Sequence, residues 1–171
     1  AHRRTRRAAR LPESDILMGK QRDAIRMSEA ELDDLFAECR SLQVATIGKD
    51  GAPHLTTLWY CRHEGKILFE TYGKSQKVVN LRRDPRLAVL VEAGETYDEL
   101  RGVSVRGRAE LVEGGPRLRS LMRVLVDHHF PGQEDDALDA MTADMARKRI
   151  VVIVHAEKVI SWDHRKLGPS G

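Results

Sequence analysis

The hydrophobic and polar positions of this chain change their period several times, and each change predicts a new element. Between residues 29 and 41 apolar side chains recur at helical spacing, which predicts a short amphipathic helix. Ser28 and Glu31 form a capping-box pattern, in which each side chain accepts a hydrogen bond from the other residue's backbone N–H, so the helix is expected to begin there. The apolar positions of this helix are Leu32, Leu35, Phe36 and Cys39.

Three strands are expected next, over residues 44–47, 53–61 and 66–72, because these runs are rich in apolar, β-branched and aromatic residues. Asp50-Gly51 lies between the first two runs, and an Asp-Gly pair suits a hairpin turn that needs positive φ. The pattern therefore predicts consecutive strands joined by hairpins.

A helical pattern follows the third strand. Val78, Val79 and Leu81 are expected to face the core of the protein. Asp84-Pro85 is expected to end the helix, because proline disfavours helical backbone at the residue before it.

The second half of the chain contains further strands and a helical insertion. The expected elements are strands over 87–92 and 102–112, helices over 116–125 and 134–148, and strands over 150–154 and 159–162. Hairpins dominate this order, and no βαβ unit repeats. The sequence therefore predicts a mainly β fold with helices (α+β), an antiparallel barrel with helical insertions rather than a doubly wound sheet.

Length and charge bound the organisation. A chain of 171 residues is about one domain's worth and can bury a core without disulfides or a structural metal. Its net charge is only +3, and residues 1–10 hold five arginines and no acid. We expect residues 1–27 to be a flexible basic N-terminal arm and residues 28–171 to be a single domain. The alternative is an arm that docks on the domain or on an anionic ligand.

Cellular location is predicted from three features. Cys39 and Cys61 are the only cysteines and lack a paired spacing, which favours a reducing compartment. No apolar run approaches the ~18 residues of a membrane span. The arginine-rich beginning is not followed by the apolar segment of a secretory signal. We therefore expect a cytoplasmic protein without membrane contact.

The most informative chemistry lies where the third strand passes into a helix. Gly73 turns the chain, and Lys74, Ser75 and Lys77 occupy the first helical turn. Free N–H groups and the helix dipole attract an anion at such a position, and lysines add full charge. By this reasoning alone, an ordinary helix cap with solvated lysines remains an equal alternative.

Three longer runs, over residues 51–60, 66–69 and 77–86, together resemble the pyridoxamine-phosphate-oxidase-like split-barrel superfamily. The most specific part is Asn-Leu-Arg-Arg-Asp-Pro-Arg, which begins at Asn80. The flavin and deazaflavin oxidoreductase branch, abundant in actinobacteria, is the closer match. The resemblance covers about residues 28–166. It implies a six-stranded antiparallel split barrel of the FMN-binding type, which forms a homodimer with the cofactor in a groove at the subunit interface.

The resemblance also implies the residues of a cofactor site. Four residues of the second strand would line the flavin or deazaflavin ring: Leu55, Thr56, Thr57 and Leu58. Four residues would bind the phosphate: Thr71, Lys74, Ser75 and Lys77. Asn80 would brace this site from the next helical turn, and Tyr72 would stack on the ribityl chain or have a purely structural role.

Two departures from the family pattern argue against vitamin B6 oxidation. The phosphate turn reads Ser75-Gln76-Lys77 where pyridoxamine phosphate oxidases commonly have Ser-Arg-Lys. The tail over residues 161–166 also lacks the Arg-x-His pair that meets the vitamin. The resemblance therefore implies an oxidoreductase that uses the deazaflavin coenzyme F-420, or alternatively FMN, to pass hydride to a small unsaturated or quinone-like substrate. A non-enzymatic flavin, deazaflavin or haem carrier is the other alternative.

No catalytic triad is needed, because hydride chemistry belongs to the cofactor. The sequence offers four candidates for the proton donor to the reduced substrate: Tyr60, Tyr97, His54 and solvent. The substrate pocket is expected to use residues 94–101 and the helical insertion over 114–148.

Other partners are not expected. Asp127-His128-His129 is the only histidine cluster, and adjacent helical residues point about 100° apart, so no metal site is predicted. His155 is expected to end a strand rather than to bind haem. Nucleic-acid binding through the arginine arm is disfavoured, because the domain shows no basic face alternating with aromatic residues.

Overall fold

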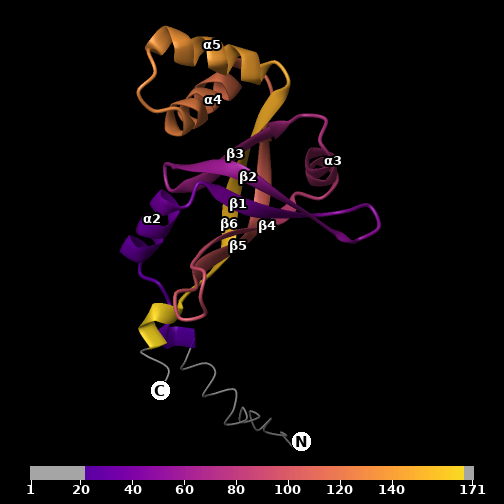
Figure 1. The fold of residues 1–171 in the computed structure, drawn as a ribbon. Coiled ribbons are helices and arrows are strands. Elements are labelled where there is room, and N and C mark those ends of the chain that lie inside the picture. The colour runs from indigo at the N-terminus through magenta and orange to yellow at the C-terminus, as the bar shows by residue number, and fades with distance from the viewer. Residues whose placement is uncertain (1–21, 168–171) are drawn as a thin grey trace, which may run out of the picture.

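A computed structural model of the chain describes residues 22–167, and its elements carry the labels of Figure 1. Six antiparallel strands form a closed barrel in the order β1-β2-β3-β6-β5-β4, and β4 pairs back onto β1. The strands are β1 (Ser41–Ile47), β2 (Pro53–His63), β3 (Lys66–Tyr72), β4 (Arg86–Ala93), β5 (Arg101–Val112) and β6 (Arg149–Asp163). The helices are α2 (Glu29–Glu38), α3 (Gln76–Arg83), α4 (Gly115–His129) and α5 (Asp135–Ala146), followed by a short 3₁₀ helix, η1 (His164–Leu167). The predicted fold class, a six-stranded antiparallel split barrel with helices, is confirmed.

The local signals at the start of the domain are also confirmed. The capping box begins α2, with the Ser28 side chain accepting from the Glu31 N–H and the Glu31 side chain accepting from the Ser28 N–H. Gly51 has a φ of 83° in the β1–β2 hairpin, as its turn requires.

The last strand differs from the prediction, because the two strands expected over 150–154 and 159–162 are one strand of 15 residues. The pairing with β5 shifts between Arg106 and Gly107, so that Glu157 has no cross-strand partner. This β-bulge carries the chain through a polar stretch that interrupts the apolar alternation. Gly107 is required there, because a Cβ at this position would lie 2.0 Å from the carbonyl oxygen of His155. His155 itself lies within β6 rather than at a strand end.

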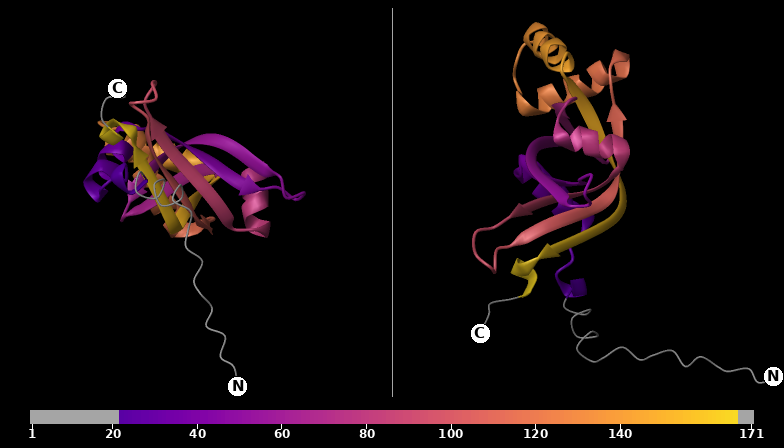
Figure 2. Two further views of the ribbon diagram at one scale, coloured as in Figure 1. Left: turned by 90° about the horizontal axis from the view of Figure 1, so that it is seen from below. Right: turned by 90° about the vertical axis from the view of Figure 1, so that its right-hand side faces the viewer.

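Two apolar clusters hold the elements together. The first fills the barrel with inward side chains of all six strands, and α2 and α3 pack against it. The second lies between the outer face of β2, β3 and β6 and the helices α4 and α5. Figures 1 and 2 show these two helices stacked at one end of the barrel, with η1 at the other end.

The buried face of α3 differs from the one that its sequence predicts. Val78 and Leu81 are buried as expected, but Val79 is 46% exposed. The buried arc of α3 also includes Lys77 and Asn80, so its inner face carries polar groups where the pattern predicts only apolar ones.

Strands β2 and β3 pair with each other along only part of their length. Their pairing runs from His63 opposite Lys66 to Tyr60 opposite Phe69. Beyond that point, residues 53–59 of β2 pair with β1 alone, and residues 70–72 of β3 pair with β6 alone. We call the opening between these two edges the seam. Each edge presents backbone groups without a cross-strand partner.

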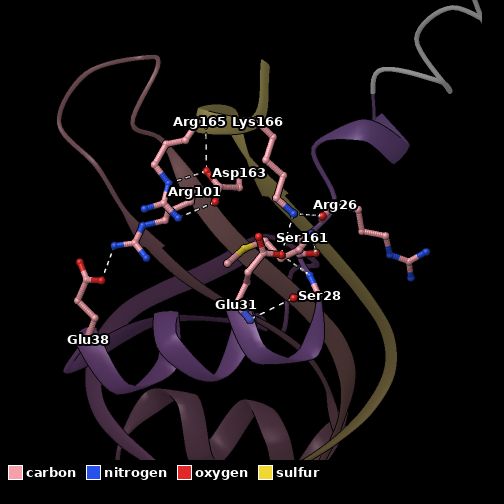
Figure 3. A network of polar contacts seen from close by, with 10 residues as sticks. Arg26, Ser28, Glu31, Glu38, Arg101, Ser161, Asp163, Arg165 and Lys166 are labelled. Atoms are coloured by element: carbon pink, nitrogen blue, oxygen red, sulfur yellow. Dashed lines mark hydrogen bonds and ion pairs between the residues drawn. The ribbon is translucent and has the colours of Figure 1, made fainter. Parts of the chain in front are cut away.

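A polar network lies at the end of the barrel opposite α4 and α5 (Figure 3). We call it the clasp, and it includes residues 26–31 and 161–166. Met27 N–H donates to Ser161 Oγ at 3.1 Å, and Lys166 Nζ donates to the carbonyl oxygen of Arg26 at 2.7 Å. Lys166 also forms an ion pair with Glu31 at 2.7 Å. Residues 26–27, the end of the predicted basic arm, therefore contact the barrel, whereas most of that arm lies outside the described residues.

Candidate functional site

A buried cluster of polar side chains lies where β3 passes into α3. Lys77 is only 9% exposed and Thr71 only 4%. Lys77 Nζ donates to Thr71 Oγ1 at 3.2 Å, and Thr71 Oγ1 lies 3.4 Å from Ser75 Oγ. Ser75 is the N-cap residue of α3, but its side chain makes no capping hydrogen bond. Its hydroxyl group is thus directed to the cluster, and the first N–H groups of the helix have no side-chain cap there.

The charge of Lys77 is poorly compensated. Burial lowers the pKa of Lys77, and the negative charge of Glu70 partly opposes that change. A buried ammonium group is costly unless it is paired, and a neutral hydroxyl satisfies only one of its three N–H donors. An anion with several acceptor oxygens, such as a phosphate, could satisfy the remaining donors of Lys77.

Asn80 connects this cluster to the barrel. It is fully buried, and its Nδ2 donates to Thr46 Oγ1 on β1 at 3.0 Å. Its Oδ1 accepts from Gln76 Nε2, also at 3.0 Å. These two bonds fix the first turns of α3 against β1, and a bracing role beside a phosphate stays a prediction.

Two further expected site residues are exposed: Lys74, expected at the phosphate, and Tyr72, expected at the ribityl chain or in a structural role. Lys74 is exposed in the turn before α3. Tyr72 is 54% exposed and lies on the outer face of β3, where the Arg149 guanidinium lies 4.5 Å from its ring centre. The structure thus brings together Thr71, Ser75 and Lys77, and it places Lys74 and Tyr72 outside that cluster.

The four residues expected to line a ring lie along the β2 edge of the seam. Their side chains alternate: Thr56 and Leu58 are half-buried, whereas Leu55 and Thr57 are exposed on the other face. The four residues therefore do not share one side-chain face, and what they have in common is the backbone edge of β2 at the seam. Two neighbouring polar atoms there are buried without a partner, Thr56 Oγ1 and His54 Nδ1. A groove of about 700 Å³ between the β1–β2 hairpin and α3 includes His54 in its lining.

The proton-donor candidates are separated by the fold. Tyr60 lies in the barrel core, where its hydroxyl donates to the carbonyl oxygen of Phe36 at 3.0 Å, and burial raises its pKa. Tyr97 lies in the β4–β5 loop and stacks on His164, with 4.6 Å between ring centres. Of the three side chains, His54 alone lies at the seam. The loop over 94–100 and the helices α4 and α5 also lie at opposite ends of the protomer (Figure 1), so they do not form one pocket within a single chain.

A cavity of about 340 Å³ lies at the closed end of the seam, beneath α4 and α5. Most of its lining comes from the helical insertion over 114–148, where a pocket was expected, but the loop over 94–100 takes no part in it. Its polar lining includes Glu70, His129 and Arg149, and Arg149 Nη1 forms an ion pair with Glu70 at 2.6 Å. Sequence reasoning did not single out Glu70 or Arg149, although Glu70 is a charged residue inside the apolar run of β3.

The histidines do not gather. Within residues 22–167, no group of three or more metal-ligating side chains is present. His155 Nε2 lies 2.7 Å from Glu110 Oε2, on the exposed outside of the barrel. No helix in this same range is long and apolar enough to cross a membrane.

Comparison with known proteins defines the class. The family model described as pyridoxamine 5′-phosphate oxidase matches residues 28–163, and the chain belongs to this family. A crystal structure of a conserved hypothetical protein from Mycobacterium tuberculosis is 47% identical, with a TM-score of 0.80, covering 88% of this chain and 93% of that one. No curated protein matches the chain significantly.

More distant structures share the fold alone. An F-420 reductase is 22% identical, with a TM-score of 0.54, over 74% of this chain and 94% of that one. HutZ, the haem storage protein from Vibrio cholerae, is 14% identical, with a TM-score of 0.63, over 78% and 94% respectively. The same barrel therefore occurs in proteins with different ligands, so the ligand must be argued from the residues of this chain.

Proposed function

We propose that this chain is an oxidoreductase that holds the phosphate of the deazaflavin coenzyme F-420 at the Lys77 cluster and uses it to reduce a small unsaturated or quinone-like substrate. The observation that carries the proposal is the buried Lys77 ammonium at the start of α3, whose hydrogen bond within residues 22–167 goes to Thr71 Oγ1. The family membership and the similarity to an F-420 reductase support a flavin-type cofactor. FMN is the alternative, because it offers the same phosphate.

The residues of the chain supply binding and orientation. Lys77, Thr71 and Ser75 would donate to the phosphate oxygens, and Asn80 would hold α3 in position. The unpaired edge of β2 over residues 55–58 would offer backbone groups to the polar edge of the ring. The bound cofactor supplies the hydride, so no acid–base pair is required for that transfer.

The proposal includes a homodimer with the cofactor at the interface. Val79 on α3 and Val159 and Ile160 on β6 are each between 44% and 49% exposed. Exposed apolar side chains of this size are available for contact with a second copy of the chain. Light scattering on the purified protein is expected to give twice the mass of the chain, and a monomer would contradict this part of the proposal.

Two measurements test the function. Titration with F-420 and with FMN, followed by fluorescence, is expected to show tighter binding of F-420. Micromolar binding of FMN without any binding of F-420 would overturn the preference. Incubation with reduced F-420 and a panel of quinones and enones should then oxidise the cofactor. Binding without oxidation across the panel would instead identify a carrier of the cofactor.

A further inference from the structure

The cavity at the closed end of the seam combines an aromatic wall with buried polar atoms. Trp59, on the outer face of β2, is 51% exposed and leaves its ring available. The ring centre of His129 lies 5.2 Å from that of Trp59, and that of Phe130 lies 6.4 Å away. Met141 and Met145 complete the apolar lining from α5. Flat rings and flexible thioethers suit a planar ligand.

Two hydrogen-bonding atoms in this lining are buried without a partner, Glu70 Oε2 and His129 Nε2. Such atoms are rare in folded proteins, since each loses its hydration without replacing it. They come from β3 and α4, on two sides of the same cavity. A ligand with a donor for the carboxylate and a second polar atom for the imidazole would satisfy both.

The charges of the cavity argue against an anionic ligand. The cation that lines it, Arg149, is already paired with Glu70 through Nη1, and its Nη2 donates to the Tyr72 hydroxyl at 3.2 Å. Burial and the neighbouring charge of His128 lower the pKa of His129 to about 4, so its imidazole is neutral at neutral pH. Asp144 adds a further negative charge. Among the residues that line the cavity, a phosphate would meet two carboxylates and a single cation, Arg149, which is already paired.

The cavity also lies beside the proposed ring site. Trp59 and Glu70 are the residues immediately beyond the last β2–β3 pair, Tyr60 opposite Phe69. The proposed ring site along residues 55–58 of β2 is therefore followed directly on the same strand by Trp59 in the cavity wall, whereas the proposed phosphate site lies at the Lys77 cluster. The volume of about 340 Å³ is at the lower end for small-molecule sites, which fits one or two fused rings.

We propose that this cavity is the substrate subsite, and that it binds an uncharged planar unsaturated or quinone-like molecule that carries an O–H or N–H donor, stacked on Trp59 and hydrogen-bonded to Glu70 and His129. The identification as a substrate subsite rests on the proposed cofactor function. The binding of such a molecule does not rest on that function. The binding proposal and the cofactor proposal can therefore fail separately.

The test uses benzimidazole and 1-methylbenzimidazole as matched probes, because the second has a methyl group in place of the N–H donor of the first. Binding is followed through Trp59 fluorescence in a Trp162→Phe background, in which Trp59 is the remaining tryptophan. In mildly alkaline buffer, where both probes are uncharged, benzimidazole is expected to bind at least about tenfold more tightly, since a hydrogen bond to a carboxylate is lost with the methyl group.

Variants assign the contact. His129→Phe keeps a ring against Trp59 but removes the nitrogen, and it should weaken benzimidazole binding severalfold. His128→Phe is the matched control, because His128 is exposed and does not line the cavity, and it should bind as the parent does. Equal affinity for the two probes, absence of quenching, or equal effects of the two variants would overturn the proposal.

Titration of the same preparation with F-420 and FMN separates this result from the proposed function. Cofactor binding without probe discrimination would overturn the subsite and leave the function standing. Probe discrimination without cofactor binding would support the binding site and overturn the oxidoreductase assignment, and with it the identification of the site as a substrate subsite.

Discussion

The seam and the clasp are both rich in polar side chains, but they treat those side chains differently. In the clasp, Asp163 is buried and accepts two bonds from the Arg165 guanidinium, at 2.9 Å and 2.6 Å, and Lys166 contacts both Arg26 and Glu31. Around the seam, polar atoms of His54, Thr56 and Glu70 are buried without partners. The polar groups of the clasp thus find partners within the chain, whereas these three atoms at the seam keep bonding capacity that a ligand could use.

The comparison predicts that substitutions near the seam lower cofactor affinity, whereas substitutions in the clasp lower stability. The largest expected effect is at Lys77. Lys77→Met removes the cation from the cluster, and we expect cofactor affinity to fall roughly 10- to 100-fold, because bonds between ions and phosphate are among the strong ones. The free protein should be at least as stable as the parent, because a buried charge is removed. Lys74→Met is the control, since Lys74 is exposed, and it should change affinity less. Loss of stability with unchanged affinity would contradict this assignment.

The clasp should respond in the reverse way. Asp163→Asn removes a buried carboxylate and is expected to lower the free energy of unfolding by about 1–3 kcal/mol, without changing cofactor affinity. Asp84 provides a matched control, because it pairs with Arg86 two residues later in the same arrangement but is more exposed. Asp84→Asn should cost less than about 1 kcal/mol. Denaturant titrations of the two variants measure the difference.

Acid should weaken the clasp in a defined pH window. The ammonium group of Lys166 and the N–H and hydroxyl groups of Ser28 lower the pKa of Glu31 from 4.5 to about 2. A carboxyl whose folded pKa is lowered stabilises the fold above its unfolded pKa, and this contribution is lost as the pH falls from about 4.5 to about 2. In the Glu31→Gln variant, the melting temperature should depend less on pH across that window. An unchanged slope would show that Glu31 is not the group responsible.

The cavity should respond at higher pH than the clasp. Since the pKa of His129 falls from 6.5 to about 4, the unfolded chain binds a proton in that interval that the folded chain does not. Stability should therefore decline as the pH falls from 6.5 to 4, and His129→Phe should remove part of this decline. His128→Phe, measured in parallel, should retain most of it, because burial of His129 is the largest cause of the shift and the charge of His128 is a smaller one.

The architecture could be predicted from the sequence because its signals are local. The capping box at Ser28, the Asp50-Gly51 turn and the alternation of β5 each depend on neighbouring residues, and each is confirmed. The continuity of β6 could not be predicted in this way. Its bulge at Glu157 exists because Gly107 on β5 allows close approach of the two strands, which is a property of the pair.

The Lys77 cluster and the cavity could each be predicted only in part: the insertion over 114–148 was expected to line a pocket, but its partners on the strands were not. Thr71, Ser75 and Lys77 lie within seven residues of one another, so one strand-to-helix junction brings them together. The cavity joins Trp59, Glu70, His129 and Arg149, which come from four elements that meet only in the folded chain. The exposure of Val79 was missed because apolar periodicity cannot reveal that Lys77 and Asn80 occupy the buried arc of α3.

The central claim, that the Lys77 cluster holds the phosphate of a flavin-type cofactor, is tested most directly by comparing ligands that differ in phosphate. Affinities of F-420 and phosphate-free deazariboflavin, and of FMN and riboflavin, would be measured with the parent chain and with Lys77→Met. The account predicts that the parent binds the phosphorylated member of at least one pair much more tightly, and that Lys77→Met removes most of that difference. Equal affinities within both pairs, or a difference that survives Lys77→Met, would contradict it.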